Sequence, residues 1–200
     1  PAGLAPEDRQ GYASPQRPAH IAIADLDADG KPDLSYVTHE PSEIVIALGR
    51  GNGTFVTGTR HTMVGRPLDL ATGEVNGDKV MDLIATSSAP DMVAVWLGGS
   101  DLRGPWRETA VDFQPESVLG VGDVNADGWA DLAILQRGSL LFVMPGQSDG
   151  HFGQNLAYGM VYGGPMVLAD LTGDGRLDVG VVEENDGVIR WNLYRNTLCH

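Results

Sequence analysis

The stretch DLDADGKPD, residues 25–33, places four aspartates in a loop of nine residues. The loops begin 49, 49 and 47 residues apart along the chain. Because a fixed period of this length is the signature of a repeat architecture, the chain is predicted to contain four copies of one structural unit. The other three copies of the loop are EVNGDKVMD (74–82), DVNADGWAD (123–131) and DLTGDGRLD (170–178).

Apolar segments on both sides of each loop alternate with the period of two that is typical of β-strands. The second strands are expected at 34–38, 83–86, 132–136 and 179–182. A third strand follows in each copy, read as EIVIALG, MVAVWLG, LLFVMPG and VIRWNLY. In three copies a fourth, more polar strand begins at the aromatic residue that ends GNGTF, LRGPW or SDGHF. Since one propeller blade consists of four antiparallel strands, the prediction is an all-β fold, a β-propeller with four blades in this chain.

The oxygen-bearing residues of the four loops have the spacing that a calcium ion needs. Ca²⁺ takes six to eight oxygen ligands, which a tight loop supplies from residues 1, 3 and 5, a backbone carbonyl at residue 7 and a closing carboxylate. Without a cation the crowded carboxylates would repel each other, and one would protonate. We therefore expect about one Ca²⁺ per repeat, up to four. The predicted ligands are Asp25, Asp27, Asp29, Lys31 and Asp33; Glu74, Asn76, Asp78, Val80 and Asp82; Asp123, Asn125, Asp127, Trp129 and Asp131; and Asp170, Thr172, Asp174, Arg176 and Asp178.

The second loop departs from this pattern at residue 6. Glycine at this position (Gly30, Gly128 and Gly175) permits the positive φ that wraps the loop around an ion, whereas the second loop has Lys79. The second site is therefore predicted to be the weakest. An EF-hand would need flanking helices and a glutamate at residue 12, which none of the loops has. The alternative of acidic turns on a solvated edge would not keep a fixed register.

A strand, a D-x-D-x-D-G-x-x-D loop, a second strand and a G-x-G-T-F turn, repeated at this length, resemble the FG-GAP/VCBS repeat family, the blades of integrin-α-like β-propellers. The resemblance covers about residues 19–196. It implies a calcium-binding propeller. The roles that the resemblance implies are those of adhesion heads, lectins, protein-interaction scaffolds and propeller domains of polysaccharide-degrading enzymes. Because one fold serves all of these roles, the resemblance does not decide the activity.

Ring size is the point at which this chain departs from the family, whose propellers commonly have seven blades. A single domain, residues 1–200, is expected to hold all four blades. The last copy stops after its third strand, and residues 5–18 resemble the missing strand. The expected ring is closed by this N-terminal segment, and a pair of chains forming an eight-bladed ring is the alternative. The expected blades are 19–62, 66–112, 116–160, and 165–196 together with 5–18.

The composition limits the classes of partner and the cellular locations that we expect for this chain. A formal net charge of −14 disfavours nucleic acid and anionic membranes, and the apolar runs are too short for membrane insertion. The chain starts at Pro1 without a signal peptide, which suggests that a leader or preceding region was removed. The single cysteine, Cys199, is expected to be a spare thiol, with an intermolecular disulfide as the alternative. Acidity, calcium loops and the resemblance favour secretion or a cell-surface location.

No catalytic residue is predicted, because the chain lacks the common nucleophile, metalloprotease, phosphate-loop and dinucleotide motifs. The expected function is a non-enzymatic extracellular binding module, a lectin or adhesion propeller, whose partner is a carbohydrate or a protein and which could form a homodimer. A polysaccharide lyase or hydrolase, or a purely structural interaction domain, is the alternative. Among the tryptophans, Trp129 is expected to be exposed, whereas Trp96, Trp106 and Trp191 are expected to pack within blades.

Overall fold

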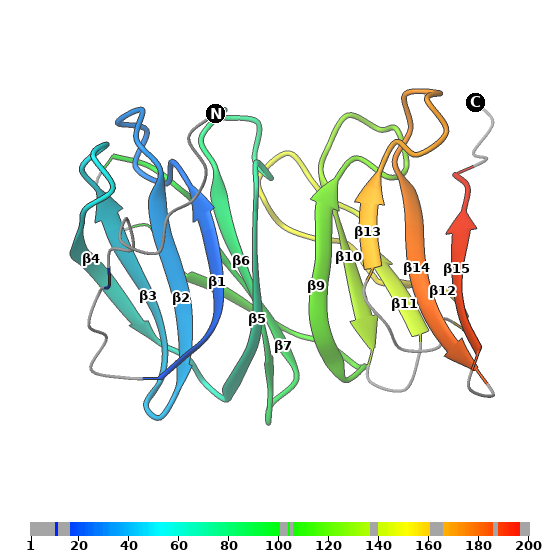
Figure 1. The fold of residues 1–200 in the computed structure, drawn as a ribbon, viewed down its shortest axis with the longest axis horizontal. Helices are drawn as coiled ribbons and strands as arrows, with labels where there is room; N and C mark the ends of the chain where they lie inside the picture. The colour runs from blue at the N-terminus through cyan, green and yellow to red at the C-terminus, as the bar shows by residue number, and fades with distance from the viewer. Residues whose placement is uncertain are drawn as a thin grey trace.

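The computed structural model describes residues 11, 17–100, 104, 106–136, 140–160, 166–185 and 188–196. In these residues fifteen strands form four antiparallel sheets (Figure 1). The first sheet contains β1 (Pro18–Ala24), β2 (Asp33–His39), β3 (Ser42–Gly49) and β4 (Phe55–Thr62). The second contains β5 (Arg66–Gly73), β6 (Asp82–Ser88), β7 (Met92–Trp96) and β8 (Trp106–Ala110). The third contains β9 (Pro115–Gly122), β10 (Asp131–Gln136), β11 (Leu140–Met144) and β12 (Leu156–Met160), and the fourth β13 (Met166–Ala169), β14 (Asp178–Asn185) and β15 (Val188–Tyr194).

The core lies between successive sheets, because each interior strand buries both of its faces. On β6, Leu83 and Ala85 belong to a cluster shared with the first sheet, while Ile84 between them belongs to a cluster shared with the third. A third cluster joins Ala133 of β10 to Val179 of β14. The period of two in the sequence therefore reflects two apolar interfaces per blade, as a stack of propeller blades requires.

Small residues on one sheet face large residues on the next along the row of first strands. A Cβ placed on Gly73 of β5 would lie 2.3 Å from Cγ1 of Val121 on β9. A Cβ on Gly120 of β9 would similarly lie 2.8 Å from Cβ of Leu168 on β13. Real Cβ atoms do not come this close, so these glycines permit the close approach of the sheets. The first strands contact one another in the order β1, β5, β9 and β13.

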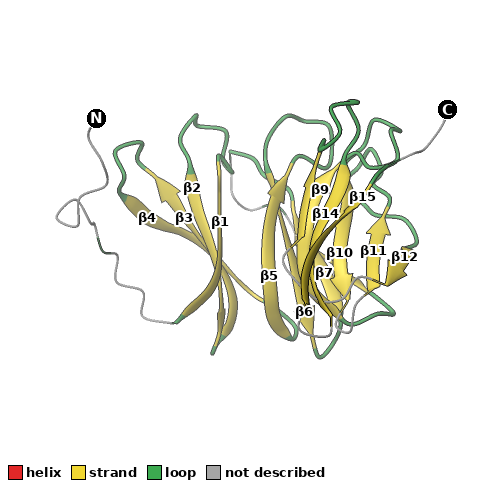
Figure 2. Cartoon of the chain, turned by 45° about the vertical axis from the view of Figure 1, so that its right-hand side comes forward, coloured by secondary structure: helices red, strands yellow, loops and turns green. Residues whose placement is uncertain are grey.

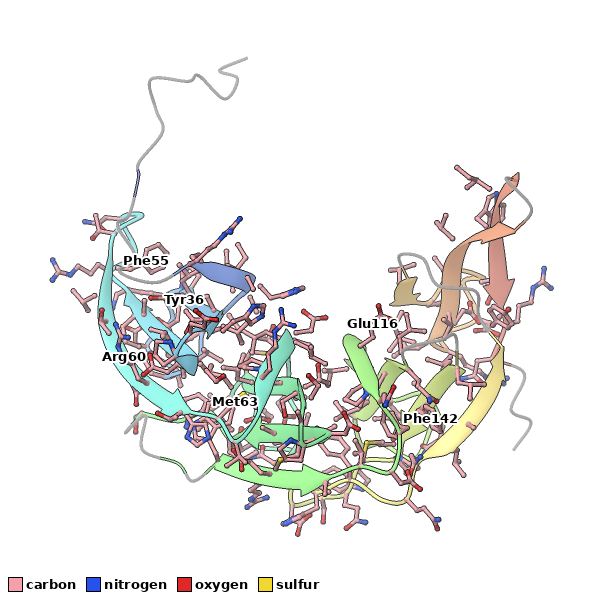
Figure 3. The ribbon with its side chains drawn as sticks, turned by 90° about the horizontal axis from the view of Figure 1, so that it is seen from below. Tyr36, Phe55, Arg60, Met63, Glu116 and Phe142 are labelled. Atoms are coloured by element: carbon pink, nitrogen blue, oxygen red, sulfur yellow. The ribbon has the colours of Figure 1, made fainter. Side chains whose placement is uncertain are left out.

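The four sheets form an open arc, with the first and fourth sheets at its opposite ends (Figure 3). The fourth sheet has three strands within the residues that the structure describes. Pro18 is the first residue of β1 in the first sheet. The remainder of the segment 5–18, expected as the missing strand, lies outside the described residues except for Gly11 and Arg17. Closure of the ring by this segment therefore stays a prediction.

Two local predictions were wrong. Trp191 was expected to pack within its blade, but its side chain is exposed, because it lies on the face of the fourth sheet that no other described sheet covers. Phe152 was expected to begin the fourth strand of the third blade. It instead forms an isolated bridge with Gly146, and β12 begins at Leu156. Over the described ranges, no helix is long and apolar enough to cross a bilayer.

Candidate metal centre

The acidic loops connect the first strand of each sheet to the second, and all four lie along one edge of the arc. This is the upper edge in Figure 1, where the loops follow β1, β5, β9 and β13. Figure 2 shows the same loops above the ends of the strands. One edge of the molecule therefore carries all four predicted sites.

In the first loop, Asp25, Asp27 and Asp29 form a compact acidic cluster. Each offers one carboxylate oxygen, and these atoms lie within 4.8 Å of one another. Carboxylate oxygens at this separation can share a hard divalent cation. The structure thus brings together residues 1, 3 and 5 of this loop, and the donor set suits calcium.

Backbone amides of the same loop orient these carboxylates. The amides of Asp29 and Gly30 donate to the two carboxylate oxygens of Asp25, at 3.1 and 2.9 Å. The amide of Lys31 donates to Oδ1 of Asp29 at 2.9 Å. The third and fourth loops repeat the first pair of bonds, to Asp123 from Asp127 and Gly128 at 3.2 and 2.9 Å, and to Asp170 from Asp174 and Gly175 at 3.1 and 2.8 Å.

Each loop is wound by two residues with positive φ, at positions 4 and 6. Position 6 was predicted from its glycines, but position 4 was missed. In the first loop Ala28 has φ 60° and Gly30 has φ 81°. In the second, Lys79 has φ 69° although it is not a glycine. The sequence signal for position 4 was present, since the second and fourth loops have Gly77 and Gly173 there.

The charged groups of the first loop shift the pKa values of its aspartates in opposite directions. Burial raises the pKa of Asp27, and the neighbouring carboxylates Asp33, Asp29 and Asp25 raise it further. The ammonium group of Lys31, paired with Oδ2 of Asp29, instead lowers the pKa of Asp29. Lys31 was predicted as a ligand only through its backbone carbonyl, so its side chain adds a local positive charge. A divalent cation would offset the remaining repulsion far more strongly than one lysine does.

The aspartate at position 9 has a different environment from the other carboxylates of its loop. Both oxygens of this residue accept backbone amides, one from residue 2 of the loop and one from the last residue of the third strand or from the second residue after it. Position 9 is buried in every loop. The bonds to Asp33 come from Leu26 and Gly49 at 2.9 and 2.8 Å, to Asp82 from Val75 and Gly98 at 2.7 and 2.8 Å, to Asp131 from Val124 and Gly146 at 2.9 and 2.8 Å, and to Asp178 from Leu171 and Asn196 at 3.0 and 2.9 Å.

Position 9 therefore fastens the loop to the third strand of its own sheet. A carboxylate oxygen has more than one lone pair, so these bonds are compatible with the predicted ligand role, which stays a prediction. Burial raises the pKa of Asp82 to about 6 and also raises the pKa of Asp131. The pKa of Asp178 is lowered, chiefly by the backbone amide of Asn196.

The second loop differs from the other three at position 1. Oε1 of its glutamate, Glu74, accepts hydrogen bonds from the backbone amides of Asn76 and Gly77, at 2.9 and 2.5 Å. These donors are residues 3 and 4 of the loop, whereas in the other loops residues 5 and 6 donate to position 1. Trp129 of the third loop lies over this turn, with Cζ3 3.1 Å from the position that a Cβ on Gly77 would occupy. Trp129 is therefore partly buried, and the expectation that it is exposed was wrong.

Trp96 and Trp106 pack against other side chains of the core, as predicted. Trp96 is buried. The ring of Trp106 stacks on His61 of the first sheet, with centroids 4.5 Å apart, and lies 6.3 Å from Trp96. Nε2 of His61 lies 3.2 Å from Oε1 of Glu108, which holds β4 against β8. These rings therefore serve the interface between the first and second sheets.

A family model for FG-GAP-like repeats matches residues 25–85 and 123–181, more than half of the chain. The chain belongs to the FG-GAP-like repeat family. Each of the two matches starts at residue 1 of an acidic loop and extends through the next loop, so that the pair of matches includes all four loops. Each match thus runs from the loop of one sheet to the second strand of the next sheet, and its bounds are offset from those of the sheets. No curated protein matches the chain.

Proposed function

We propose that this chain is a calcium-stabilised, non-enzymatic propeller module that acts outside the cell and binds a carbohydrate or protein ligand. The acidic cluster of Asp25, Asp27 and Asp29 is the observation that carries the calcium part. Membership of the FG-GAP-like repeat family supports it. The net charge of −14 disfavours an anionic polysaccharide as the ligand.

The residues present fit a calcium ion in their chemistry. Carboxylates of residues 1, 3 and 5 and the carbonyl of residue 7 would hold it, and the loop amides already orient the carboxylates. Bound calcium would supply the positive charge that the cluster lacks and would stabilise the turn between β1 and β2. At about 10⁻³ M calcium and a dissociation constant of about 10⁻⁴ M, mass action gives about 1.4 kcal/mol per site. Extracellular calcium would fill such sites.

Calcium titration with a matched control tests this part of the proposal. Calcium should raise the melting temperature of the chain by about 4 °C per filled site, and EDTA should reverse the rise. Asp27→Asn should remove one equivalent of binding in isothermal titration calorimetry. Asp149→Asn should leave it unchanged, because Asp149 is an exposed aspartate in a turn outside the four loops. Melting curves that are identical in calcium and in EDTA would overturn the proposal.

The ligand is tested by a glycan-array screen of the chain in calcium and in EDTA. Selective binding that is lost in EDTA would support a lectin whose loop edge forms or shapes the site. An empty array in calcium would exclude the carbohydrate branch for the glycans present and favour the protein branch. Pull-down with the immobilised chain, with EDTA elution, would then test that branch directly.

A further inference from the structure

Both ends of the arc expose apolar side chains, at positions that are buried in the interior sheets. On the first sheet, Ile21 and Ile23 of β1 are 63% and 59% exposed. On the fourth sheet, Ile189 and Trp191 of β15 are 71% and 77% exposed. Val167 of β13 and Val182 of β14 are exposed on the fourth sheet as well. We call the first group the head face and the second group the tail face.

The same positions are buried wherever another sheet follows or precedes. Trp191 pairs with Val182 across β15 and β14, as Val93 pairs with Thr86 in the second sheet. Val93 and Thr86 are buried against the third sheet. The tail face is therefore the surface that a further blade covers elsewhere in this chain.

The head face is the surface that a preceding blade covers in the other sheets. Ile21 lies four residues before the first loop, as Leu70 does before the second. Leu70 is buried in the cluster shared by the first and second sheets. On β1 itself, Ala22 and Ala24 already pack toward the second sheet, so that Ile21 and Ile23 lie on the opposite face of the strand.

The two faces are complementary by the rule that holds between the interior sheets. Between the second and third sheets, Gly73, directly before a loop, meets Val121, two positions before the next loop. Between the third and fourth sheets, Leu168, again two positions before its loop, meets Gly120. At the free ends, the small residue of the tail face is Ala169 and the large residue of the head face is Ile23. A tail face placed against a head face would thus set a small residue of one first strand against a large residue of another, as the second, third and fourth sheets do.

We propose that the tail face of one chain docks on the head face of a second copy, and that two copies close head to tail into a ring of eight blades. The open arc separates the two faces within one chain (Figure 3), which favours contact in trans. Two copies related by a twofold axis make the contact twice and leave no apolar end. The inference concerns assembly and does not depend on calcium or on the ligand.

Mass measurement with paired variants tests this assembly. Size-exclusion chromatography with light scattering should give wild-type chain at twice the 21.2 kDa mass of one chain. Ile23→Glu on the head face and Trp191→Glu on the tail face should each weaken the dimer by about 30-fold or more, since a buried carboxylate would replace an apolar anchor. Val64→Glu, at an equally exposed valine in the turn before β5, should remain dimeric.

Mixing the two variants separates a head-to-tail contact from other arrangements. Each variant alone spoils both contacts of its own dimer, but a mixed dimer retains one contact between an intact head and an intact tail. The mixture should therefore recover dimer. Recovery would support the proposal. A head-to-head or tail-to-tail dimer would leave one variant fully dimeric, which would overturn it.

Two further results would overturn the proposal. Wild-type chain that stays monomeric at all concentrations would show that the end faces are covered within the chain or by another partner, and mass rising without limit would indicate an open filament. If a glutamate variant does not fold, the emission of Trp191 supplies the test. Wild-type emission should shift to longer wavelength on dilution, and Trp191→Phe should abolish most of that shift. A wild-type emission that does not change across the dissociation range would count against the interface.

Discussion

The exposed and the buried carboxylates of each acidic loop are the same kind of group with opposite environments. In the first loop Asp25, Asp27 and Asp29 converge near the surface, where their charges repel. Asp33 lies beneath them, buried, with both oxygens bonded to backbone amides. The difference indicates that one motif combines two tasks. The exposed group is suited to a cation, and the buried group holds the loop to its sheet with or without one.

The sharpest way to break this comparison is to remove a buried carboxylate in the absence of calcium. Asp131 accepts the amides of Val124, Asn125 and Gly146, and Asp131→Ala would leave these donors without their acceptor. We expect the free energy of unfolding in EDTA to fall by about 3 kcal/mol. Urea denaturation followed by circular dichroism measures this change.

The control for this experiment is the exposed carboxylate of the same loop. Asp127→Ala removes the bonds that its carboxylate accepts from the Asn125 amide group and the Trp129 backbone, which solvent can replace, so the unfolding free energy in EDTA should change by less than about 1 kcal/mol. Equal losses for the two variants would show that buried and exposed positions do not differ in the way the hydrogen bonds suggest.

The reverse experiment neutralises a half-buried carboxylate of the acidic cluster and compares calcium with EDTA. Asp27→Asn should remove the stabilisation by calcium at the first loop, about 1.4 kcal/mol under the conditions given above. In EDTA the variant should be as stable as wild type or slightly more stable, because the neighbouring carboxylates no longer repel that side chain. Thermal unfolding in the two buffers gives both numbers. A loss of stability in EDTA would mean that Asp27 is structural, as Asp33 is.

Much of this architecture could be predicted from the sequence, because each blade has the same local rules. The period of two, the glycines and the fixed register of the loops located the strands and the acidic cluster. The division of tasks within a loop could not be predicted, since Asp25 and Asp33 look alike in a motif and differ only in burial. Trp191 was misplaced for a similar reason. Its environment depends on which sheet covers its face, and the strand pattern alone is the same for covered and uncovered blades.

Lys79 offers the smallest expected effect and sharpens the comparison among the loops themselves. It has φ 69° at the position where the other loops have glycine. Because a side chain in the left-handed region costs about 1 kcal/mol, Lys79→Gly should stabilise the chain by up to that amount in EDTA.

Lys31→Gly is the matched control, since Lys31 is the other lysine of the chain and is not among the described residues with positive φ. It should be neutral or destabilising, because glycine there gains no relief of strain and loses the ion pair with Asp29. Urea denaturation of both variants in EDTA compares them directly. If Lys79→Gly lowered the free energy of unfolding as much as Lys31→Gly does, the positive φ of Lys79 would have no energetic cost. The prediction that the second loop forms the weakest site would then depend only on the different hydrogen bonds of Glu74.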